Sequence, residues 1–346
     1  MKILVIGAGL SGSTVARVLA DAGHYVHVID KRDHVAGNAY DYRSACGFMV
    51  HLYGPHLFHT NNERVFSFLS RFTDWVNYEH RVVAKVGSDF YPFPPNAEVK
   101  KVMTDEQIVD TFYRPYTRKM WGKEIEEINP EILNRVPRRE DYEDRYFPND
   151  RYQCLPKAGY TEMVEAMLDH EKIELSLETV FRRSMMDNYD HVFSTMSIDE
   201  FYEFEHGVLD YRSIKFSKYY GETLFDDLKG LAATINFTSS HDPYTRATCW
   251  NKLPTNEINT IDVPTRQNPY IKNSYVTYET PCDFRSNDME RYYPLSDEKN
   301  KSLYETYRSI KDDKVTHLGR CGLYVYINMD QAVNSALVKS AKFLKC

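Results

Sequence analysis

Three glycines near the N-terminus have the spacing that binds the pyrophosphate of a dinucleotide. Gly7, Gly9 and Gly12 directly follow an apolar run at residues 3–6. In such a motif the first glycine permits a tight turn, the second lets the backbone approach the pyrophosphate, and the third lets helix and strand pack closely. Asp30 lies 18 residues after Gly12, where a carboxylate can accept hydrogen bonds from an adenosine ribose. The three glycines and Asp30 together predict a nucleotide-binding site. The alternative is an ordinary βαβ unit that binds no ligand.

The segments around this motif alternate between strands and helices. Apolar periodicity predicts a strand over 3–6, a helix over 13–22 and a strand over 25–29. The N-terminus of that helix supplies free N–H groups and a partial positive charge for phosphates. The alternation resumes with a helix from 161, strands over 173–175, 190–195 and 315–319, a turn at Gly319-Arg320, and a closing helix over 330–343. The nucleotide domain is therefore expected to be discontinuous in sequence.

The middle of the chain predicts a different architecture. A strand over 78–86 and a turn at 87–89 indicate a hairpin, and Pro92, Pro94 and Pro95 are expected to end regular structure. A helix is predicted over 105–121. Residues 206–295 are predominantly β in pattern.

Composition excludes several classes of protein. The chain has 346 residues, which suggests two domains, and a formal charge of −7, which argues against a nucleic-acid groove. Mean hydropathy is −0.56, and no apolar run approaches the roughly 20 residues of a membrane span. The six cysteines are scattered, without a C-x-x-C pair. This usage favours a reducing compartment, and the cytoplasm is the expected location.

Tyrosines and two histidines leave further questions. The 27 tyrosines are consistent with core filling or with a polar cleft lined by phenol hydroxyls, and composition does not choose between them. His56 and His59 could form a metal pair. No third ligand of suitable spacing follows, so no metal is expected.

The segment after Asp30 bears on the identity of the nucleotide. Residues 31–39, KRDHVAGNA, resemble the segment that follows the second strand in FAD proteins of the glutathione-reductase-like class. Ala36 stands where that pattern often has its first glycine. The resemblance implies FAD rather than NAD.

Segments in order along nearly the whole chain resemble the UDP-galactopyranose mutases. They include GAGLSG, DKRDHVAGNAY, MVHLYGPHLFHTNN, PYTRKMWG, NRVPRRED, RYQCLPKAGYTEM, INFTSSHDPYTR, RYYP and GRCGLYVYINMDQAV. The resemblance implies a flavin-dependent isomerase that interconverts UDP-galactopyranose and UDP-galactofuranose without net redox change. FAD is expected to act when reduced, through a covalent adduct between its N5 and the sugar, while UDP departs and returns.

The same resemblance implies roles for particular residues around the substrate. Arg135 and Arg246 match arginines that hold the diphosphate, because a guanidinium grips phosphate oxygens bidentately. With His59 and Tyr326 they make up the expected catalytic set. The expected substrate-binding residues are Phe112, Tyr116, Trp121, Arg135, Tyr146, Asn236, Arg246, Tyr293 and Tyr326. Phe112 and Tyr116 would face the uracil.

A second set is implied for the cofactor. The residues expected to bind FAD are Gly7, Gly9, Ser11, Gly12, Asp30, Lys31, Gly37, Asn38, His56, Leu57, Arg320, Asn328 and Met329. Arg320 and Met329 match the isoalloxazine end, where a cation would stabilise the anionic reduced flavin. An external reductant such as NAD(P)H or a reductase is an expected partner.

The fold expected from these observations is α/β. It comprises a discontinuous Rossmann-like FAD-binding domain, a small helical insertion and a mainly antiparallel β-sheet substrate domain. The expected bounds are 1–75 with 152–205 and 311–346 for the FAD domain, 97–141 for a helical domain with a mobile flap, and 76–96 with 142–151 and 206–310 for the β-sheet domain.

Two departures from the family pattern are visible. Only 15 residues separate Asn96 from Phe112, where the usual bacterial mutases carry several more helices that help form a dimer. A monomer or a non-standard dimer is therefore expected, with a flap over 118–138 hinged at Gly122. In the second departure, Asn328 replaces the aspartate of the family's Tyr-x-Asp and loses a negative charge.

Other functions stay open at this point. The same ring contraction on UDP-N-acetylgalactosamine is one alternative, although His59 favours galactose because bifunctional relatives tend to place arginine there. A flavin oxidoreductase of the amine-oxidase type shares the dinucleotide fold. A non-catalytic nucleotide-binding module is the third alternative.

Overall fold

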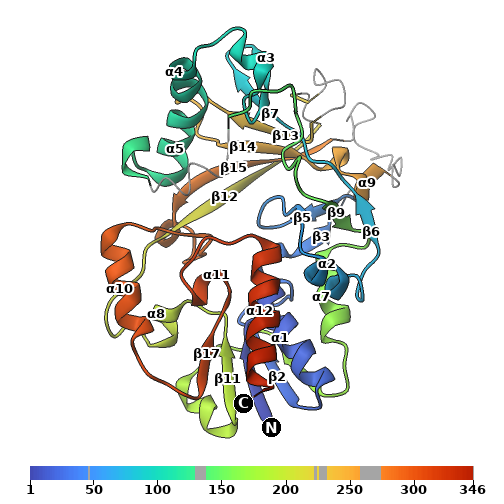
Figure 1. The fold of residues 1–346 in the computed structure, drawn as a ribbon, viewed down its shortest axis with the longest axis vertical. Helices are drawn as coiled ribbons and strands as arrows, with labels where there is room; N and C mark the ends of the chain where they lie inside the picture. The colour runs from blue at the N-terminus through green and yellow to red at the C-terminus, as the bar shows by residue number, and fades with distance from the viewer. Residues whose placement is uncertain (46, 129–137, 222–223, 226–231, 258–273, 346) are drawn as a thin grey trace.

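The first strand, β1 (Lys2–Ile6), lies at the centre of a five-stranded parallel sheet in the order β10-β2-β1-β11-β17. The other strands are β2 (Tyr25–Ile29), β10 (Ile173–Ser176), β11 (His191–Ser194) and β17 (Val315–His317). The computed structural model describes residues 1–45, 47–128, 138–221, 224–225, 232–257 and 274–345. Both chain termini lie at the same end of the molecule, close to this sheet (Figure 1). The five strands confirm the prediction of a discontinuous Rossmann-like domain.

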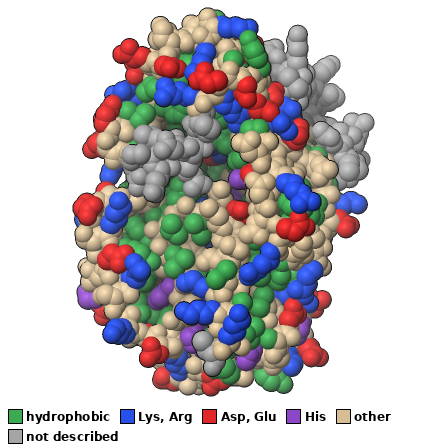
Figure 2. All heavy atoms as spheres, in the orientation of Figure 1, with side chains coloured by type: hydrophobic (Ala, Val, Ile, Leu, Met, Phe, Trp, Pro, Cys, Tyr) green, Lys and Arg blue, Asp and Glu red, His purple; other side chains and the backbone are tan. Residues whose placement is uncertain are grey.

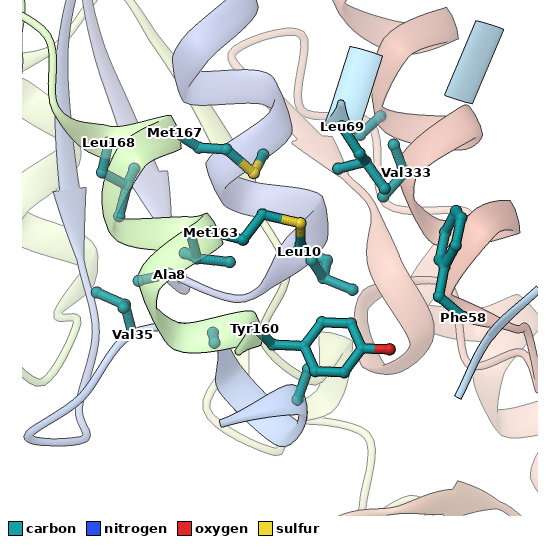
Figure 3. Close-up of a cluster of buried hydrophobic side chains, with 14 of the residues drawn as sticks. Ala8, Leu10, Val35, Phe58, Leu69, Tyr160, Met163, Met167, Leu168 and Val333 are labelled. Atoms are coloured by element: carbon teal, nitrogen blue, oxygen red, sulfur yellow. The ribbon is translucent and has the colours of Figure 1, made fainter. Parts of the chain in front are cut away.

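Helices cover both faces of the parallel sheet, which explains why residues 3–6 of its central strand are all apolar and buried. The helices on one face are α1 (Leu10–Asp21), α7 (Tyr160–Leu168) and α12 (Met329–Phe343), and those on the other are α8 (Ile198–Phe201) and α10 (Glu298–Arg308). Ile3 and Val5 face the first group, and Leu4 faces the second. Met163 of α7 shares a buried cluster with Leu10 of α1 (Figure 3).

A seven-stranded sheet lies above the parallel sheet in Figure 1 and has the order β16-β12-β15-β14-β13-β7-β8. Its strands are β7 (Val82–Val86), β8 (Asp89–Phe93), β12 (Tyr211–Tyr220), β13 (Thr234–Phe237), β14 (Arg246–Cys249), β15 (Tyr275–Asp283) and β16 (Tyr293–Pro294). Every neighbouring pair is antiparallel except β13 with β7. The prediction of a mainly antiparallel second sheet is confirmed.

Short elements connect the two large sheets. They are β3 (Asp41–Arg43) paired with β4 (Met49–His51), the three-stranded sheet of β5 (Phe58–Thr60), β9 (Tyr152–Pro156) and β6 (Trp75–Asn77), and the helices α2 (Glu63–Leu69), α9 (Pro254–Glu257) and α11 (Gly319–Gly322). Short 3-10 helices occur at Gly37–Ala39, Ile125–Glu127, Arg183–Asn188, Trp250–Lys252 and Phe284–Ser286.

One long helix bears the residues that the sequence assigns to the uracil end of the substrate. It consists of α4 (Asp105–Ile108), a π-helical stretch (Val109–Tyr113) and α5 (Arg114–Trp121), and it follows the short α3 (Ala97–Lys100). Pro115 has no N–H to donate, so the regular hydrogen-bond ladder is interrupted near the π-helical stretch. Thr104 and Gln107 form a capping box at the start, and Gly122 ends the helix with φ 65°. The predicted helix over 105–121 is confirmed.

Two local predictions are wrong. Pro92 lies inside β8, where Val83 is its partner in register, instead of ending regular structure. β8 is an edge strand, so the missing N–H of a proline costs no ladder hydrogen bond on its outer side. Gly319-Arg320, predicted as a turn, begins the short helix α11, and Gly319 takes φ 76° at that start. The residue boundaries of the three expected domains stay predictions.

The surface carries mixed charge. On the face shown in Figure 2, acidic and basic side chains are interspersed over both parts of the molecule. Among the helices of the described residues, none combines the length and the apolar composition that crossing a membrane requires.

Candidate active site

A cavity of about 420 Å³ opens beside the ends of the parallel strands, where α/β sheets bind nucleotides. Of the residues expected to bind FAD, eleven line it: Gly7, Gly9, Ser11, Asp30, Lys31, Gly37, Asn38, His56, Arg320, Asn328 and Met329. Gly12 and Leu57 do not. The cavity therefore runs from the glycine turn and Asp30 to Arg320 and Met329, which the sequence assigns to opposite ends of the cofactor.

The three glycines of the motif differ in what occupies the space where a Cβ would lie. A Cβ on Gly7 would lie 2.0 Å from the Thr195 hydroxyl oxygen, and one on Gly12 would lie 1.9 Å from the Gly7 carbonyl oxygen. Both positions are therefore required by the fold itself. A Cβ on Gly9 would meet nothing closer than 3.6 Å, and Gly9 lines the cavity. Its missing side chain keeps space for a ligand rather than for the protein, which fits a bound pyrophosphate.

Asp30 is held at the end of β2 by two backbone hydrogen bonds. Its carboxylate oxygens accept from the N–H of Ala8 at 2.8 Å and of Arg32 at 3.0 Å. Ala36 lies close by with φ 67°, a left-handed conformation that favours glycine, which explains why the related pattern often has glycine there. Asp30 therefore stands fixed in the cavity wall as a hydrogen-bond acceptor, which fits the adenosine ribose of FAD.

His56 lies in the cavity wall and is neutral. Burial lowers its pKa to about 3, and its Nδ1 lies 2.8 Å from the Gly54 carbonyl oxygen. Nδ1 must then donate to that oxygen, so Nε2 keeps its lone pair.

Arg246 is the centre of the second half of the site. It lies on β14 opposite Asn236 of β13, and its Nε donates to the Asn236 side-chain oxygen at 3.4 Å. Its Nη1 lies 3.9 Å from Oε1 of Glu279, which is only 4% exposed. Burial alone would lower the pKa of Arg246, but Glu279 and the nearby tyrosines Tyr116, Tyr146 and Tyr293 outweigh it and raise the pKa. The guanidinium is therefore a fixed, permanent cation.

The phenols around this cation are neutral hydrogen-bond donors. Burial raises the pKa of both Tyr116 and Tyr293 well above the usual value. The Tyr293 and Tyr326 rings pack edge to face with centroids 5.1 Å apart, and Trp121 packs edge to face against both. Tyr116 and Tyr293 also pack against the buried cluster of Met120, Trp121 and Ile128, so these tyrosines fill part of the core as well as surrounding Arg246.

Arg320 connects the two halves of the site. It lines the cavity, and its guanidinium carbon lies 5.3 Å from the ring centroids of both Tyr293 and Tyr326. Its Nη1 and Nη2 donate to the carbonyl oxygens of Tyr292 and Ile327. These bonds fix the cation between the cofactor cavity and the phenols.

His59 is oriented by residues that sequence reasoning did not single out. Its Nδ1 lies 2.5 Å from a carboxylate oxygen of Asp150, whose other oxygen accepts from the Asn61 side chain at 2.8 Å. The Phe147 ring stacks on the imidazole with centroids 3.6 Å apart. His80, whose pKa burial lowers to about 3, lies beside Phe147 and Tyr146, with ring centroids 6.4 Å and 5.7 Å away. His59 thus belongs to the same cluster as Arg246.

Three other predicted residues take different places. Phe112 is 1% exposed and packs against Phe93 and Tyr91, so its role toward uracil stays a prediction. Arg135 lies outside the described residues. Asn328 is the N-cap of α12 and forms a capping box with Gln331, a role that aspartate would also fill, so the structure does not explain the lost charge.

Comparison with known proteins decides the family. A family model described as UDP-galactopyranose mutase matches residues 111–326, and one described as an NAD(P)-binding Rossmann-like domain matches residues 5–72. A probable UDP-galactopyranose mutase from Klebsiella pneumoniae is 33% identical, over 99% of this chain and 94% of that protein. The chain belongs to the UDP-galactopyranose mutase family.

One further sequence relative and one solved structure are also similar to this chain over almost its whole length. A dTDP-fucopyranose mutase from Escherichia coli is 30% identical over 99% of this chain and 98% of that protein. The crystal structure of a reduced UDP-galactopyranose mutase superposes with a TM-score of 0.72 at 16% identity, covering 99% of this chain and 94% of that one. That structure shares the fold. Membership favours mutase chemistry over that of the amine oxidases.

A substitution at Gly9 tests the cofactor cradle. We expect Gly9→Ala to fold like the wild type, because its Cβ meets only ordinary contacts, and to bind FAD at least about tenfold more weakly, which corresponds to about 1.4 kcal/mol. The measurement is titration of apoprotein with FAD, followed by flavin fluorescence, with the unfolding midpoint of the apoprotein as the control. Unchanged FAD affinity would show that the pyrophosphate does not approach Gly9.

Proposed function

We propose that this protein interconverts UDP-galactopyranose and UDP-galactofuranose, with FAD in the dinucleotide cavity and active in its reduced state. The proposal rests chiefly on the surroundings of Arg246. This permanent cation lies among protonated tyrosines, and one of them, Tyr293, contacts the guanidinium of Arg320 at the cavity wall. A diphosphate is the ligand that this set suits. The proposal also draws on the named activities of the family's members.

The first task of the site is to stabilise a departing diphosphate. When the bond between the sugar and UDP breaks, negative charge develops on the diphosphate, and a donor already in place costs no reorganisation. Arg246 would grip the phosphate oxygens, and Tyr116 and Tyr293 would donate neutral hydrogen bonds. Glu279 offsets part of the positive charge, so that UDP is held without being trapped.

The second task belongs to the cofactor and its surroundings. Reduced FAD, when bound, supplies the nucleophile for the anomeric carbon. Arg320 faces the cavity with both guanidinium ends anchored on backbone carbonyls, so its charge would stabilise an anionic ring system there. The tyrosines and Trp121 above it would exclude water from the sugar.

The third task is proton movement during the change of ring size. Opening one sugar ring requires a proton at the ring oxygen, and closing the other requires removal of a proton from a different hydroxyl. With Nδ1 of His59 engaged by Asp150, its Nε2 is the atom free to hold such a proton. Asp150 would stabilise the imidazolium form while the proton is held.

A second candidate substrate has a specific observation behind it. The Escherichia coli relative, matched over almost the whole of both chains, is a dTDP-fucopyranose mutase. Such a substrate differs from UDP-galactose in its base, in the 2′-hydroxyl of its ribose and in the 6-hydroxyl of its sugar. The same cation and phenols would serve its diphosphate, so activity measurements decide between the two.

Several finer expectations accompany the proposal. We infer an external electron donor, such as NAD(P)H or a reductase, and a cytoplasmic location. We also propose a monomer or a non-standard dimer, because the helical insertion is short.

Dependence on reduction tests the proposed function. We expect the holoenzyme treated with dithionite to interconvert the ring forms of UDP-galactose, and the oxidised holoenzyme to be inactive. Chromatography of the sugar nucleotides measures this, with dTDP-fucose and UDP-N-acetylgalactosamine as parallel substrates. Equal activity in both redox states, or no activity on any of the three, would contradict the proposal.

Removal of the central cation tests the role of Arg246. We expect Arg246→Gln to raise the barrier to turnover by about 2–4 kcal/mol while FAD stays bound, because a charge-assisted contact to the leaving group is lost. Steady-state kinetics of the reduced enzyme measures the effect. Arg285→Gln is the matched control, since Arg285 is 48% exposed and pairs with Asp210 and Asp283. If Arg246→Gln turned over like this control, the diphosphate would not bind at Arg246.

A further inference from the structure

Three walls of the substrate site come from separate parts of the chain. Helix α5 carries Tyr116 and Trp121, the β13–β14 hairpin carries Asn236 and Arg246, and the edge of the same sheet carries Tyr293. The sheet fixes the second and third walls by its own hydrogen bonds. The helix is not part of the sheet. Apolar packing of Phe112 against Phe93 holds the π-helical stretch before it, and polar contacts hold its C-terminal end.

Lys119 joins α5 to the hairpin. Its ammonium donates to three backbone carbonyl oxygens, those of Phe237 at 2.7 Å, Tyr244 at 2.8 Å and Ser239 at 3.0 Å. All three N–H groups of the side chain are therefore used. Phe237 is the last residue of β13, directly after Asn236, and Ser239 and Tyr244 lie in the connection that leads to Arg246 at the start of β14.

The Lys119 side chain is charged although it is partly buried. Lys119 is half-buried, and burial lowers its pKa to about 8, a shift that Asp242 opposes. At neutral pH the side chain is still an ammonium. It points at backbone oxygens and does not line the dinucleotide cavity.

Arg212 joins the same end of α5 to the sheet. Its Nε donates to the Met120 carbonyl oxygen at 2.7 Å, and its Nη2 donates to that of Lys119 at 3.2 Å. The last carbonyls of a helix have no partner within the helix, and a cation there also complements the helix dipole. Arg212 lies on β12 opposite Tyr293 of β16, so the bond ties the helix to the third wall.

We propose that Lys119 and Arg212 are positioning residues that clamp the end of α5, so that Tyr116 and Trp121 face Arg246 and Tyr293. They act through these residues and not on the substrate. The proposal rests on the proposed function for the identity of the ligand. The clamp holds residues 119 and 120, which belong to the flap expected over 118–138; residues 129–137 of that span lie outside the described residues.

The test measures UDP binding to the oxidised holoenzyme by calorimetry, together with KM and kcat of the reduced enzyme. We expect Lys119→Met to weaken UDP binding and to raise KM at least about tenfold, to lower kcat by a smaller factor, and to leave FAD affinity unchanged. Lys119→Arg should recover part of the UDP affinity, because it restores donors at the same place. Lys299→Met is the control, since Lys299 is 75% exposed on α10.

The outcomes distinguish a failure of the proposed function from a failure of the proposed clamp. If the wild type does not bind UDP, the proposed function fails. If the wild type binds UDP and Lys119→Met binds it equally well, the clamp fails. Should Lys119→Met not fold, Arg212→Gln decides, because it removes the charged donors to the Met120 and Lys119 carbonyl oxygens and leaves the Lys119 side chain in place. Full UDP affinity of this variant would overturn the proposal, and weakened UDP affinity with normal FAD content would support it.

Discussion

The pair formed by half-buried Arg246 and buried Glu279 is the interaction on which the candidate site depends. The two residues stand opposite each other in register on β14 and β15, so the hydrogen bonding of the sheet places them. Glu279 is almost completely buried, and an unpaired charge at such a position would cost about 3–5 kcal/mol. The pair therefore holds a charged guanidinium beside a buried carboxylate, with 26% of the Arg246 side chain exposed.

The rest of the structure brings two other elements to this pair. The parallel sheet holds the dinucleotide cavity, and Arg320 at its wall lies beneath the rings of Tyr293 and Tyr326. Helix α5 brings Tyr116 and Trp121 from the opposite side. A small molecule bound between them would touch the cofactor cavity on one side and the cation on the other, which is the arrangement that a reaction between a flavin and a sugar nucleotide needs.

Local signals in the sequence predicted the cofactor half well. The glycine turn, Asp30 and the apolar pattern of each parallel strand are local features, so periodicity and spacing reveal them. Resemblance to the family supplied Arg246 and the tyrosines, but it did not indicate what holds them. Glu279, Asp150, Lys119 and Arg212 act through partners 33 to 125 residues away. Their roles arise only when strands pair and helices dock. For Glu279, the sequence shows only an acidic residue in the tyrosine-rich strand β15. Such a residue is equally compatible with an exposed face of a strand.

The central claim is that Glu279 tempers the positive charge of Arg246 so that a diphosphate is bound and released. Calorimetric titration of the holoenzyme with UDP, comparing the wild type with Glu279→Gln, tests it most directly, because glutamine keeps the shape and removes only the charge. The account predicts that UDP binds the variant several-fold more tightly. Weaker or unchanged binding of UDP by a folded, FAD-containing variant would contradict it.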